Sequence, residues 1–322
     1  MTPEISIIIP AHNEGLEFLQ TTVNSIRDTI DVSYEIIIVD DHSTPKLGPI
    51  EGVTVLRHEL HRGVGQAFDT GVAEAKSDNI FLMGSDIRFI PNKWASMMIK
   101  EMDDHPKAFT CSTCVGLNAP LNMDVAERAK RSRRNGARIL FFHDHITHPK
   151  RPKGFKSILE CQWLPVYKGA SMDSFEVPAI LGAAYGVKRE WYRYVDGWWG
   201  HRSWGTLEPY ISLKSWLMGG SCRTAPGIQT GHIFKSEGTH GTNLAHLSYN
   251  KILMATLLFP EKDAERLIAF LPAQEGIIKA GKKMIEDREE EINKKRDEYK
   301  EKIVLDIMDY VNRFEVDFRC GK

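Results

Sequence analysis

Short hydrophobic runs alternate with amphipathic stretches along the first part of the chain. Residues 5–10 and 34–39 are continuous apolar runs enriched in β-branched side chains, which is typical of strands buried on both faces of a parallel sheet. Between them, the apolar positions of residues 16–30 recur at helical spacing. The pattern predicts a βαβ unit.

The same alternation continues as far as residue 83. Residues 52–57 and 79–83 have the pattern of a third and a fourth strand, and residues 64–75 have that of a helix. Strands and helices that alternate in this way predict an α/β fold with a mostly parallel, doubly wound sheet. In such folds, ligands bind outside the carboxyl ends of the strands.

Polar residues gather at the ends of these predicted strands. The three clusters are His12-Asn13-Glu14, Asp40-Asp41-His42-Ser43 and Ser85-Asp86. Because the carboxyl ends of parallel strands meet at one edge of a sheet, we expect these side chains to share one site.

The composition is that of an ordinary globular protein with little net charge. The 322 residues include 42 Lys and Arg against 43 Asp and Glu, a formal net charge of −1, so no global field favours a polyanionic partner. No signal-peptide pattern and no apolar run of ~20 residues is present, so we expect a soluble, cytoplasmic protein. Five cysteines are sparse and odd in number, which favours reduced thiols over a disulfide framework.

Two of the polar clusters lie in segments that resemble a known family. Residues 10–14, Pro-Ala-His-Asn-Glu, and residues 39–43, Val-Asp-Asp-His-Ser, are similar to the opening motifs of family 2 glycosyltransferases, and most of all to the polypeptide N-acetylgalactosaminyltransferases. The resemblance implies a GT-A fold and a nucleoside diphosphate sugar as donor, with UDP as the expected nucleotide. The implied donor-binding residues are Pro10, His12, Glu14, Asp40, Asp41, Arg62, Ser85, Trp204 and Gly205.

A metal site is also implied by the resemblance. Residues 84–86, Gly-Ser-Asp, fall where the family has Asp-x-Asp or Asp-x-His, with Gly84 in place of the first acid. Residues 230–235 resemble a Gly-His-Val-Phe-Arg segment whose histidine binds the metal in these relatives. Asp86 and His232 would therefore hold Mn²⁺ or Mg²⁺. Structural roles for both residues, with Asp86 capping a helix, stay open.

The longest similarity covers residues 204–220, which resemble the Trp-Gly-Gly-Glu-Asn segment and following helix of the same enzymes. Leu207 replaces the glutamate, whereas Glu208 occupies the position of the general base in the Glu-Asp loop of inverting family 2 enzymes. We therefore expect Glu208 to be the catalytic base and weakly favour inversion, although the overall likeness is to a retaining family. Alternatively, Glu208 only starts a helix, where a negative charge suits the macrodipole.

The resemblance extends from residue 5 to about residue 243. We therefore expect a catalytic domain over residues 1–245, with a donor-binding half at 1–100 and an acceptor-side half at 101–245. Residues 246–322 would form a helical extension. The dense mixed charge of residues 279–309 predicts a solvated helix or helical hairpin with a narrow apolar stripe, or alternatively a dimerisation helix.

One basic segment stands out in a chain of nearly zero net charge. Residues 128–156 carry ten Lys and Arg against one acid, Asp144. The segment is either a solvated loop or a seat for an anionic acceptor, for which Arg131, Arg133 and Arg134 are the candidate patch. The acceptor hypotheses are a hydroxylated base in DNA, a protein hydroxyl and a saccharide. A degenerate, non-catalytic nucleotide-sugar-binding module is the alternative to an enzyme.

Overall fold

The computed structural model describes residues 2–89, 93–118, 133–141, 158–166, 171–182, 184–234, 243–271 and 274–316. Its first elements follow the order predicted from the hydrophobic pattern. They are β1 (Ile5–Ala11), α1 (Leu16–Arg27), β2 (Tyr34–Asp40), β3 (Thr54–Arg57), α2 (Val64–Glu74) and β4 (Asn79–Met83). The βαβ prediction is confirmed, with boundaries shifted by up to three residues.

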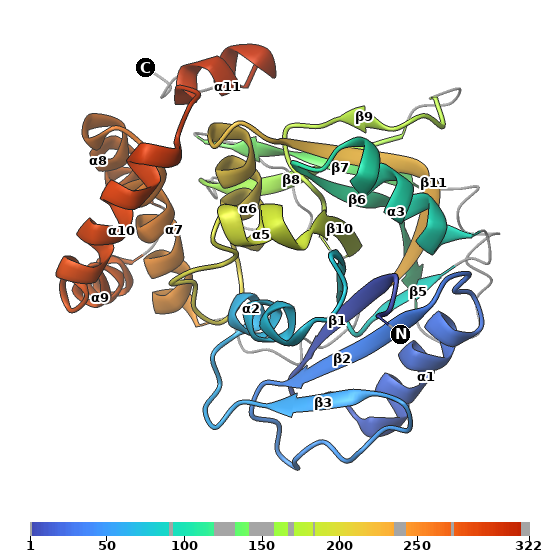
Figure 1. Ribbon diagram of the computed structural model, residues 1–322. Helices are drawn as coiled ribbons and strands as arrows, with labels where there is room; N and C mark the ends of the chain where they lie inside the picture. Colours follow the sequence, from blue (N-terminus) through green and yellow to red (C-terminus); the bar gives the residue numbers. More distant parts are fainter. Residues whose placement is uncertain are drawn as a thin grey trace.

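The middle of the chain completes the sheet (Figure 1). Its strands are β5 (Ile87–Phe89), β6 (Ala108–Asn118), β7 (Arg133–Leu140), β8 (Glu160–Pro165), β9 (Phe175–Glu176), β10 (Ala184–Lys188) and β11 (Ser221–Phe234). Its helices are α3 (Trp94–Asp104), α5 (Arg189–Tyr194) and α6 (Leu207–Leu217). The strand order is β3-β2-β1-β4-β10-β6-β11-β5, with β7 beside β6, β8 beside β7 and β9 beside β11.

Helices cover both faces of the sheet because its strands are apolar on both faces. Ile7 and Ile9 of β1 pack in one hydrophobic cluster with α1 and α3, whereas Ile8 packs on the opposite side with α2. Successive side chains of a strand point to opposite faces, so a continuous apolar run needs a layer on each side. The result is the three-layer α/β arrangement that the sequence predicts.

The sheet is mixed rather than mostly parallel, which corrects one detail of the prediction. Strands β3, β2, β1 and β4 are parallel, but β10 runs antiparallel to both β4 and β6, and β5 runs antiparallel to β11. Strand β11 is parallel to β6. A buried strand has the same hydrophobic pattern in either direction, so the direction of β10 is set by its neighbours and not by its own sequence.

The C-terminal region is helical, as predicted. It comprises α7 (Leu244–Leu258), α8 (Glu261–Ala269), α9 (Glu275–Glu286), α10 (Glu289–Lys302) and α11 (Ile307–Arg313). The Asn243 side chain caps α7 by accepting from the backbone N–H groups of Ala245 and His246. None of the helices in the described part of the chain combines the length and the hydrophobicity that a membrane crossing demands.

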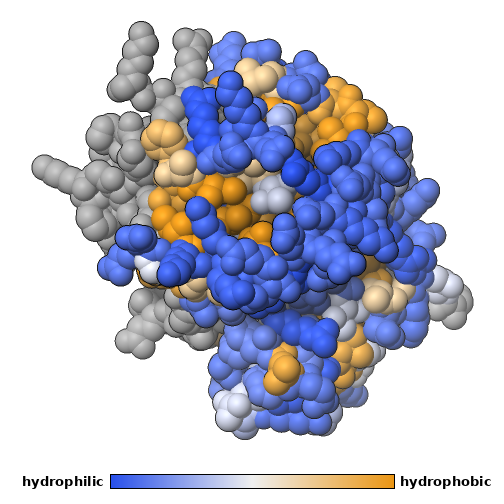
Figure 2. Space-filling model, turned by 90° about the vertical axis from the view of Figure 1, so that its left-hand side faces the viewer, coloured by the Kyte–Doolittle hydropathy of each residue, from blue (hydrophilic) through white to orange (hydrophobic). Residues whose placement is uncertain are grey.

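Among these helices, α10 packs on the rest of the chain through a narrow apolar stripe. Ile292 and Tyr299 are the buried residues of α10, and both join the main hydrophobic cluster together with α7 and α6. Seen from the side of these helices, the surface is predominantly hydrophilic (Figure 2). This confirms the solvated helical pattern; the dimerisation alternative and the expected boundary at residue 245 stay predictions.

Candidate functional site

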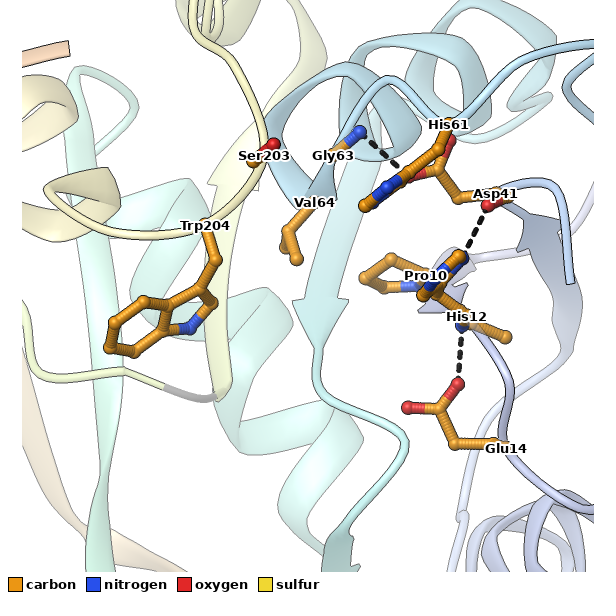
Figure 3. Close-up of a pocket in the computed structure, with 10 residues that line it drawn as sticks. Pro10, His12, Glu14, Asp41, His61, Gly63, Val64, Ser203 and Trp204 are labelled. Atoms are coloured by element: carbon orange, nitrogen blue, oxygen red, sulfur yellow. Dashed lines mark hydrogen bonds and ion pairs between the residues drawn. The ribbon is translucent and has the colours of Figure 1, made fainter. Parts of the chain in front are cut away.

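A pocket opens where β1 and β2 end, and we call it the β1–β2 pocket (Figure 3). Its lining residues are Pro10, Ala11, His12, Glu14, Asp41, His61, Gly63, Val64, Ser203 and Trp204. Five of them were predicted from the sequence: Pro10, His12, Glu14, Asp41 and Trp204. The enclosed volume is only about 30 Å³, so the pocket is a shallow seat open on one side and not a closed chamber.

Asp41 is fixed at the base of this pocket by several hydrogen bonds. Its carboxylate accepts from His58 Nδ1 at 2.7 Å and from the backbone N–H groups of Arg62 at 2.8 Å and Gly63 at 2.6 Å. Burial acts to raise the pKa of Asp41, but these hydrogen bonds outweigh it and hold the pKa below its ordinary value. The carboxylate is therefore ionised and ties the turn before α2 to the end of β2.

The turn at Gly63 brings a distant loop to the pocket. Gly63 has a φ of 98°, and a Cβ there would lie 2.4 Å from backbone atoms of Ser203. Two backbone hydrogen bonds, each of 3.3 Å, join Ser203 to Arg62 and Val64. This close approach places Trp204, 51% exposed, opposite His12 and Glu14 across the pocket (Figure 3). Gly205 follows with a φ of 102°, which turns the chain towards α6.

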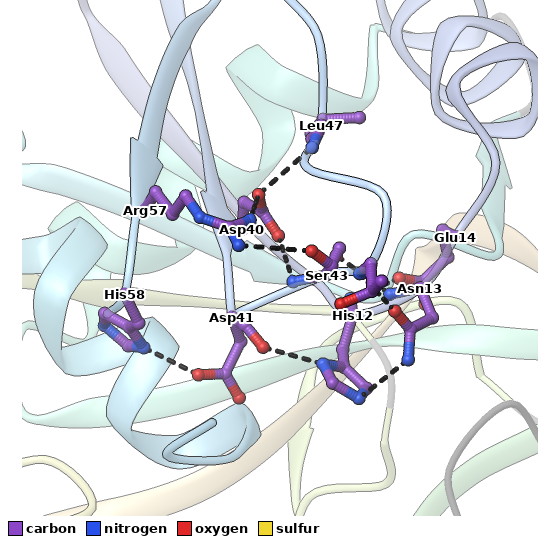
Figure 4. Close-up of polar contacts among 10 residues, drawn as sticks. His12, Asn13, Glu14, Asp40, Asp41, Ser43, Leu47, Arg57 and His58 are labelled. Atoms are coloured by element: carbon purple, nitrogen blue, oxygen red, sulfur yellow. Dashed lines mark hydrogen bonds and ion pairs between the residues drawn. The ribbon is translucent and has the colours of Figure 1, made fainter. Parts of the chain in front are cut away.

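Asp40 lies at the end of β2, as expected, with its carboxylate bound to the neighbouring loop. Its carboxylate accepts from the backbone N–H groups of Ser43 at 2.8 Å and Leu47 at 3.2 Å and forms an ion pair with Arg57 (Figure 4). Burial acts to raise the pKa of Asp40, but these contacts lower it overall. Asp40 is not among the residues that line the pocket and holds the 43–47 loop, so its contact with the donor stays a prediction.

His61 was not identified from the sequence, because nothing in its exposed loop marks it. Its ring stacks on that of His12, with centroids 4.0 Å apart and planes at 9°, and its Nε2 lies 3.3 Å from Asp41 Oδ2. His12, Asp41 and His61 together could hold a metal ion. However, the in-plane lone pairs of two stacked rings run side by side and do not converge. His12 also donates from Nδ1 to the Asp41 carbonyl and accepts at Nε2 from Asn13. A flat ring surface fits this geometry better.

Asp86 and His232, far apart in the sequence, meet at the other predicted centre. Strand β5 pairs antiparallel with β11, so that His232 faces Ile87, and the Ile233 N–H donates to the Asp86 carbonyl at 3.0 Å. His232 Nε2 lies 3.5 Å from Asp86 Oδ2. The structure thus brings the two predicted metal ligands together, and the Trp163 ring stands edge-on to His232 at 6.3 Å.

Ser85 and Glu14 connect this pair of residues to the β1–β2 pocket. The Ser85 hydroxyl donates to Glu14 Oε1 at 3.0 Å, and the other carboxylate oxygen of Glu14 accepts from the His12 backbone N–H. Ser85 directly precedes Asp86. The pocket and the Asp86–His232 pair are therefore parts of one continuous site.

Glu208 lies in the first turn of α6 and completes this site. Burial raises the pKa of the Glu208 carboxyl, and the charge of His232 acts on it in the opposite direction without cancelling the shift. Gly182 makes room for it, since a Cβ at that residue would lie 2.2 Å from Glu208 Oε1. The carboxyl is thus held in a poorly hydrated setting within electrostatic range of His232.

The remaining predicted residues lie partly outside the described portion of the chain. Arg133 and Arg134 are half-buried at the start of β7, while Arg131 and most of the basic segment lie outside the described residues. Arg62 is exposed and borders a second groove next to the pocket. The expectation of reduced cysteines is confirmed for the four described ones, Cys111, Cys114, Cys161 and Cys222.

Comparison with known proteins agrees with this geometry. Residues 6–162 match the family described as Glycosyl transferase family 2. Polypeptide N-acetylgalactosaminyltransferase 10 of Rattus norvegicus is 26% identical over 245 residues, which cover 72% of this chain and 38% of the relative. Polypeptide N-acetylgalactosaminyltransferase 8 of Drosophila melanogaster is 26% identical over 246 residues, with the same coverage. The crystal structure of GalNAc-T7 with UDP, GalNAc and Mn2+ matches with a TM-score of 0.62 and 18% identity, covering 98% of this chain and 58% of that one.

Two findings bear on the class of protein: residues 6–162 are similar to glycosyl transferase family 2, and the chain has the GT-A fold. Within that class it is similar to the polypeptide N-acetylgalactosaminyltransferases, as its motifs predict. The chain spans about two fifths of the length of these relatives.

Proposed function

We propose that the chain is a glycosyltransferase that moves a sugar from a UDP-linked donor to a hydroxyl acceptor, with the help of a divalent metal. The observation that carries the proposal is the approach of His232 to Asp86 next to the β1–β2 pocket, with Glu208 within electrostatic range of His232. Two comparisons support the proposal: the similar proteins are named as N-acetylgalactosaminyltransferases, and the crystal structure of GalNAc-T7, which has a similar fold, contains UDP and Mn2+.

The β1–β2 pocket has the chemistry that a nucleoside requires. The stacked rings of His12 and His61 offer a flat surface for a base, and Trp204 offers an aromatic face on the other side. The Glu14 and Asp41 carboxylates can accept hydrogen bonds from ribose hydroxyls or from the imide N–H of uracil. Ser85 and Gly205 would act beside the pocket, by holding Glu14 and shaping the Trp204 loop.

The Asp86–His232 pair fits a metal of the kind expected. A carboxylate oxygen and an imidazole nitrogen 3.5 Å apart need little movement to bind one ion, because each metal–ligand distance is about 2.1 Å. Mn²⁺ or Mg²⁺ would neutralise the diphosphate leaving group when bound. Because Gly84 replaces the first acid of the family motif, Asp86 in the 84–86 loop and His232 on β11 would be the protein ligands of the metal ion.

Glu208 would act as the general base. Its carboxylate takes the proton of the acceptor hydroxyl while the hydroxyl oxygen forms a bond to the anomeric carbon and the bond to the diphosphate breaks. The raised pKa strengthens Glu208 as a proton acceptor, and its poorly hydrated position limits competition by water. The match of Glu208 to the position of the base in inverting family 2 enzymes weakly favours inversion at the anomeric carbon.

The donor and the activity can be tested together with a panel of UDP-sugars. We expect at least one of them to be hydrolysed slowly to UDP in the presence of Mn²⁺, with less UDP released by Glu208→Gln. Tight binding of a UDP-sugar without turnover of any donor would instead indicate the degenerate binding module. The retention of Asp86, His232 and Glu208 in one site argues for the enzyme.

DNA is the acceptor that the basic segment favours. Arg134 pairs with Cys114 of β6, which pairs with Thr230 of β11, two residues before His232. We expect binding to duplex DNA that weakens sharply between low and physiological salt, and weakens further in the triple alanine variant of Arg131, Arg133 and Arg134. No binding even at low salt would eliminate nucleic acid and leave a protein or saccharide hydroxyl.

A further inference from the structure

A second groove lies next to the β1–β2 pocket, between the catalytic domain and the helical extension. Its volume is about 410 Å³, and it shares His61 and Ser203 with the pocket. The loop before α2, residues 199–203, α7 and α10 form its walls, and we call it the α7–α10 groove. Residues 61–66 and 288–291 meet here, so only the folded chain creates it.

Arg288 and Glu291 on the wall of the groove form an ion pair with each other. Arg288 donates from Nε and Nη2 to the two carboxylate oxygens of Glu291, at 2.8 and 2.9 Å, and from Nη1 to the Tyr249 hydroxyl at 2.6 Å. Its guanidinium also lies 5.3 Å from the centre of the Trp199 ring. The charge of Glu291, the acid among the lining residues, is therefore largely neutralised by Arg288.

Two further arginines of the groove, Arg202 and Arg62, form no ion pair in the described part of the chain, although the charge of Arg202 also acts on Glu291. Arg202 is held in place through its backbone N–H, which donates to Asn250 Oδ1 at 2.9 Å, and its guanidinium lies over the Tyr249 ring at 5.0 Å. Arg62 is exposed, and its backbone N–H is bonded to Asp41. Among the described residues, neither guanidinium forms an ion pair with an acid. The groove thus has an excess of positive charge.

Neutral polar groups lie between these arginines. His246 Nδ1 lies 2.6 Å from the Ser203 hydroxyl, where the chain divides the groove from the β1–β2 pocket. Burial, and then the charge of Arg202, lower the pKa of His246, so the imidazole is neutral at neutral pH. A hydroxyl and a neutral imidazole add hydrogen-bonding capacity without adding negative charge.

We propose that the α7–α10 groove is a binding site for a phosphate group, with Arg202 as its principal ligand. A planar guanidinium anchored by its backbone and by an aromatic face is suited to bidentate bonds with phosphate oxygens. The guanidinium of Arg62 can balance the second negative charge of the phosphate, and the Ser203 hydroxyl can donate to one of its remaining oxygens. The site is distinct from the Asp86–His232 centre, and its occupancy does not depend on the proposed transfer reaction.

Inorganic phosphate, titrated into the full chain with Mn²⁺ and saturating UDP present, tests this site while the donor pocket is occupied. We expect Arg202→Gln to weaken phosphate binding about 10- to 100-fold, which corresponds to the loss of a charged hydrogen-bonding group. Arg202→Lys should weaken it less, because the charge is kept and the fork is lost. Arg193→Gln, at an exposed position of α5, is the matched control and should bind phosphate normally.

Glucose 6-phosphate compared with glucose distinguishes a ligand-borne phosphate from the free anion. Tighter binding of the sugar phosphate than of inorganic phosphate assigns the site to a phosphorylated ligand, and the reverse order assigns it to the free anion. Equal phosphate affinity in the parent chain and in a folded Arg202→Gln variant would overturn the proposal, as would an equal loss in Arg193→Gln. If UDP does not bind at all, the donor assignment fails, while the comparison of the Arg202 variants still decides the phosphate site.

Discussion

The pKa of a carboxyl group is shifted in opposite directions in the β1–β2 pocket and in the centre around Glu208. Asp41 accepts three hydrogen bonds of 2.8 Å or less, and its pKa lies below the ordinary value. Glu208 is half-buried, and desolvation of its carboxyl with less compensation from hydrogen bonds raises its pKa. A carboxylate that must hold a ligand benefits from being permanently ionised, whereas one that must accept a proton benefits from a higher pKa.

The two regions also differ in how the chain assembles them. Half of the residues that line the pocket come from the ends of two neighbouring parallel strands, β1 and β2, that are close in sequence. The second centre needs the antiparallel pairing of β5 with β11 and the placement of α6 beside them. Substitutions in the second region should therefore affect catalysis and leave the pocket intact.

The largest effect should come from the proposed metal ligands. We expect Asp86→Ala and His232→Ala each to abolish Mn²⁺-stimulated donor turnover while the fold is retained, since either change removes half of the protein ligands. UDP release and circular dichroism would measure the two properties. Asp104→Ala, which removes an exposed carboxylate of α3 in a surface ion pair, is the control and should stay active. Undiminished turnover in Asp86→Ala contradicts the metal assignment.

Glu208→Gln should lower sugar transfer by roughly 10²- to 10⁴-fold, the usual contribution of a general base. Donor affinity should be nearly unchanged, because the β1–β2 pocket is built from other residues. Transfer rates and UDP-sugar titration measure these quantities separately. If donor binding is lost together with transfer, Glu208 has a structural or donor-holding role and is not the base.

Gly63→Ala should damage the pocket and leave the second centre less affected. The new Cβ would meet the Ser203 backbone at 2.4 Å, and the residue would keep a φ of 98° that disfavours alanine. We expect a loss of about 1–3 kcal/mol in the free energy of unfolding and weaker UDP binding. Gly15→Ala is the control, because a Cβ there meets nothing within 4 Å. Equal urea midpoints for the two variants would refute the role of this close approach.

The smallest effect concerns stability as a function of pH. Because Glu208 has a raised pKa in the folded chain, folding costs more as the pH rises from the ordinary glutamate pKa, about 4.3, through the folded value. Glutamine avoids this cost. We expect Glu208→Gln to be more stable than the parent at about pH 8 and to lose that advantage towards about pH 4. Urea unfolding at both pH values checks the sign, and a variant that is less stable at the higher pH would contradict it.

Much of the fold and part of the site followed from the sequence alone. Continuous apolar runs specify strands covered on both faces, and helical spacing specifies the helices between them, since both periods are local properties of the chain. The same local order put His12, Glu14 and Asp41 at strand ends, where the pocket lies. The motifs identified Asp86, His232 and Glu208 one by one.

Only the tertiary structure decided which of these residues meet. The direction of β10, the 3.5 Å approach of His232 to Asp86 and the turn of Asp40 towards Arg57 depend on partners far away in the sequence. Neither His61 nor the α7–α10 groove could be identified from the sequence. The local sequence around an exposed histidine or arginine is the same whether or not a distant loop packs beside it. Hydrophobic periodicity fixes each element locally, whereas strand pairing and hydrogen-bond partners are selected by the packing of the whole chain.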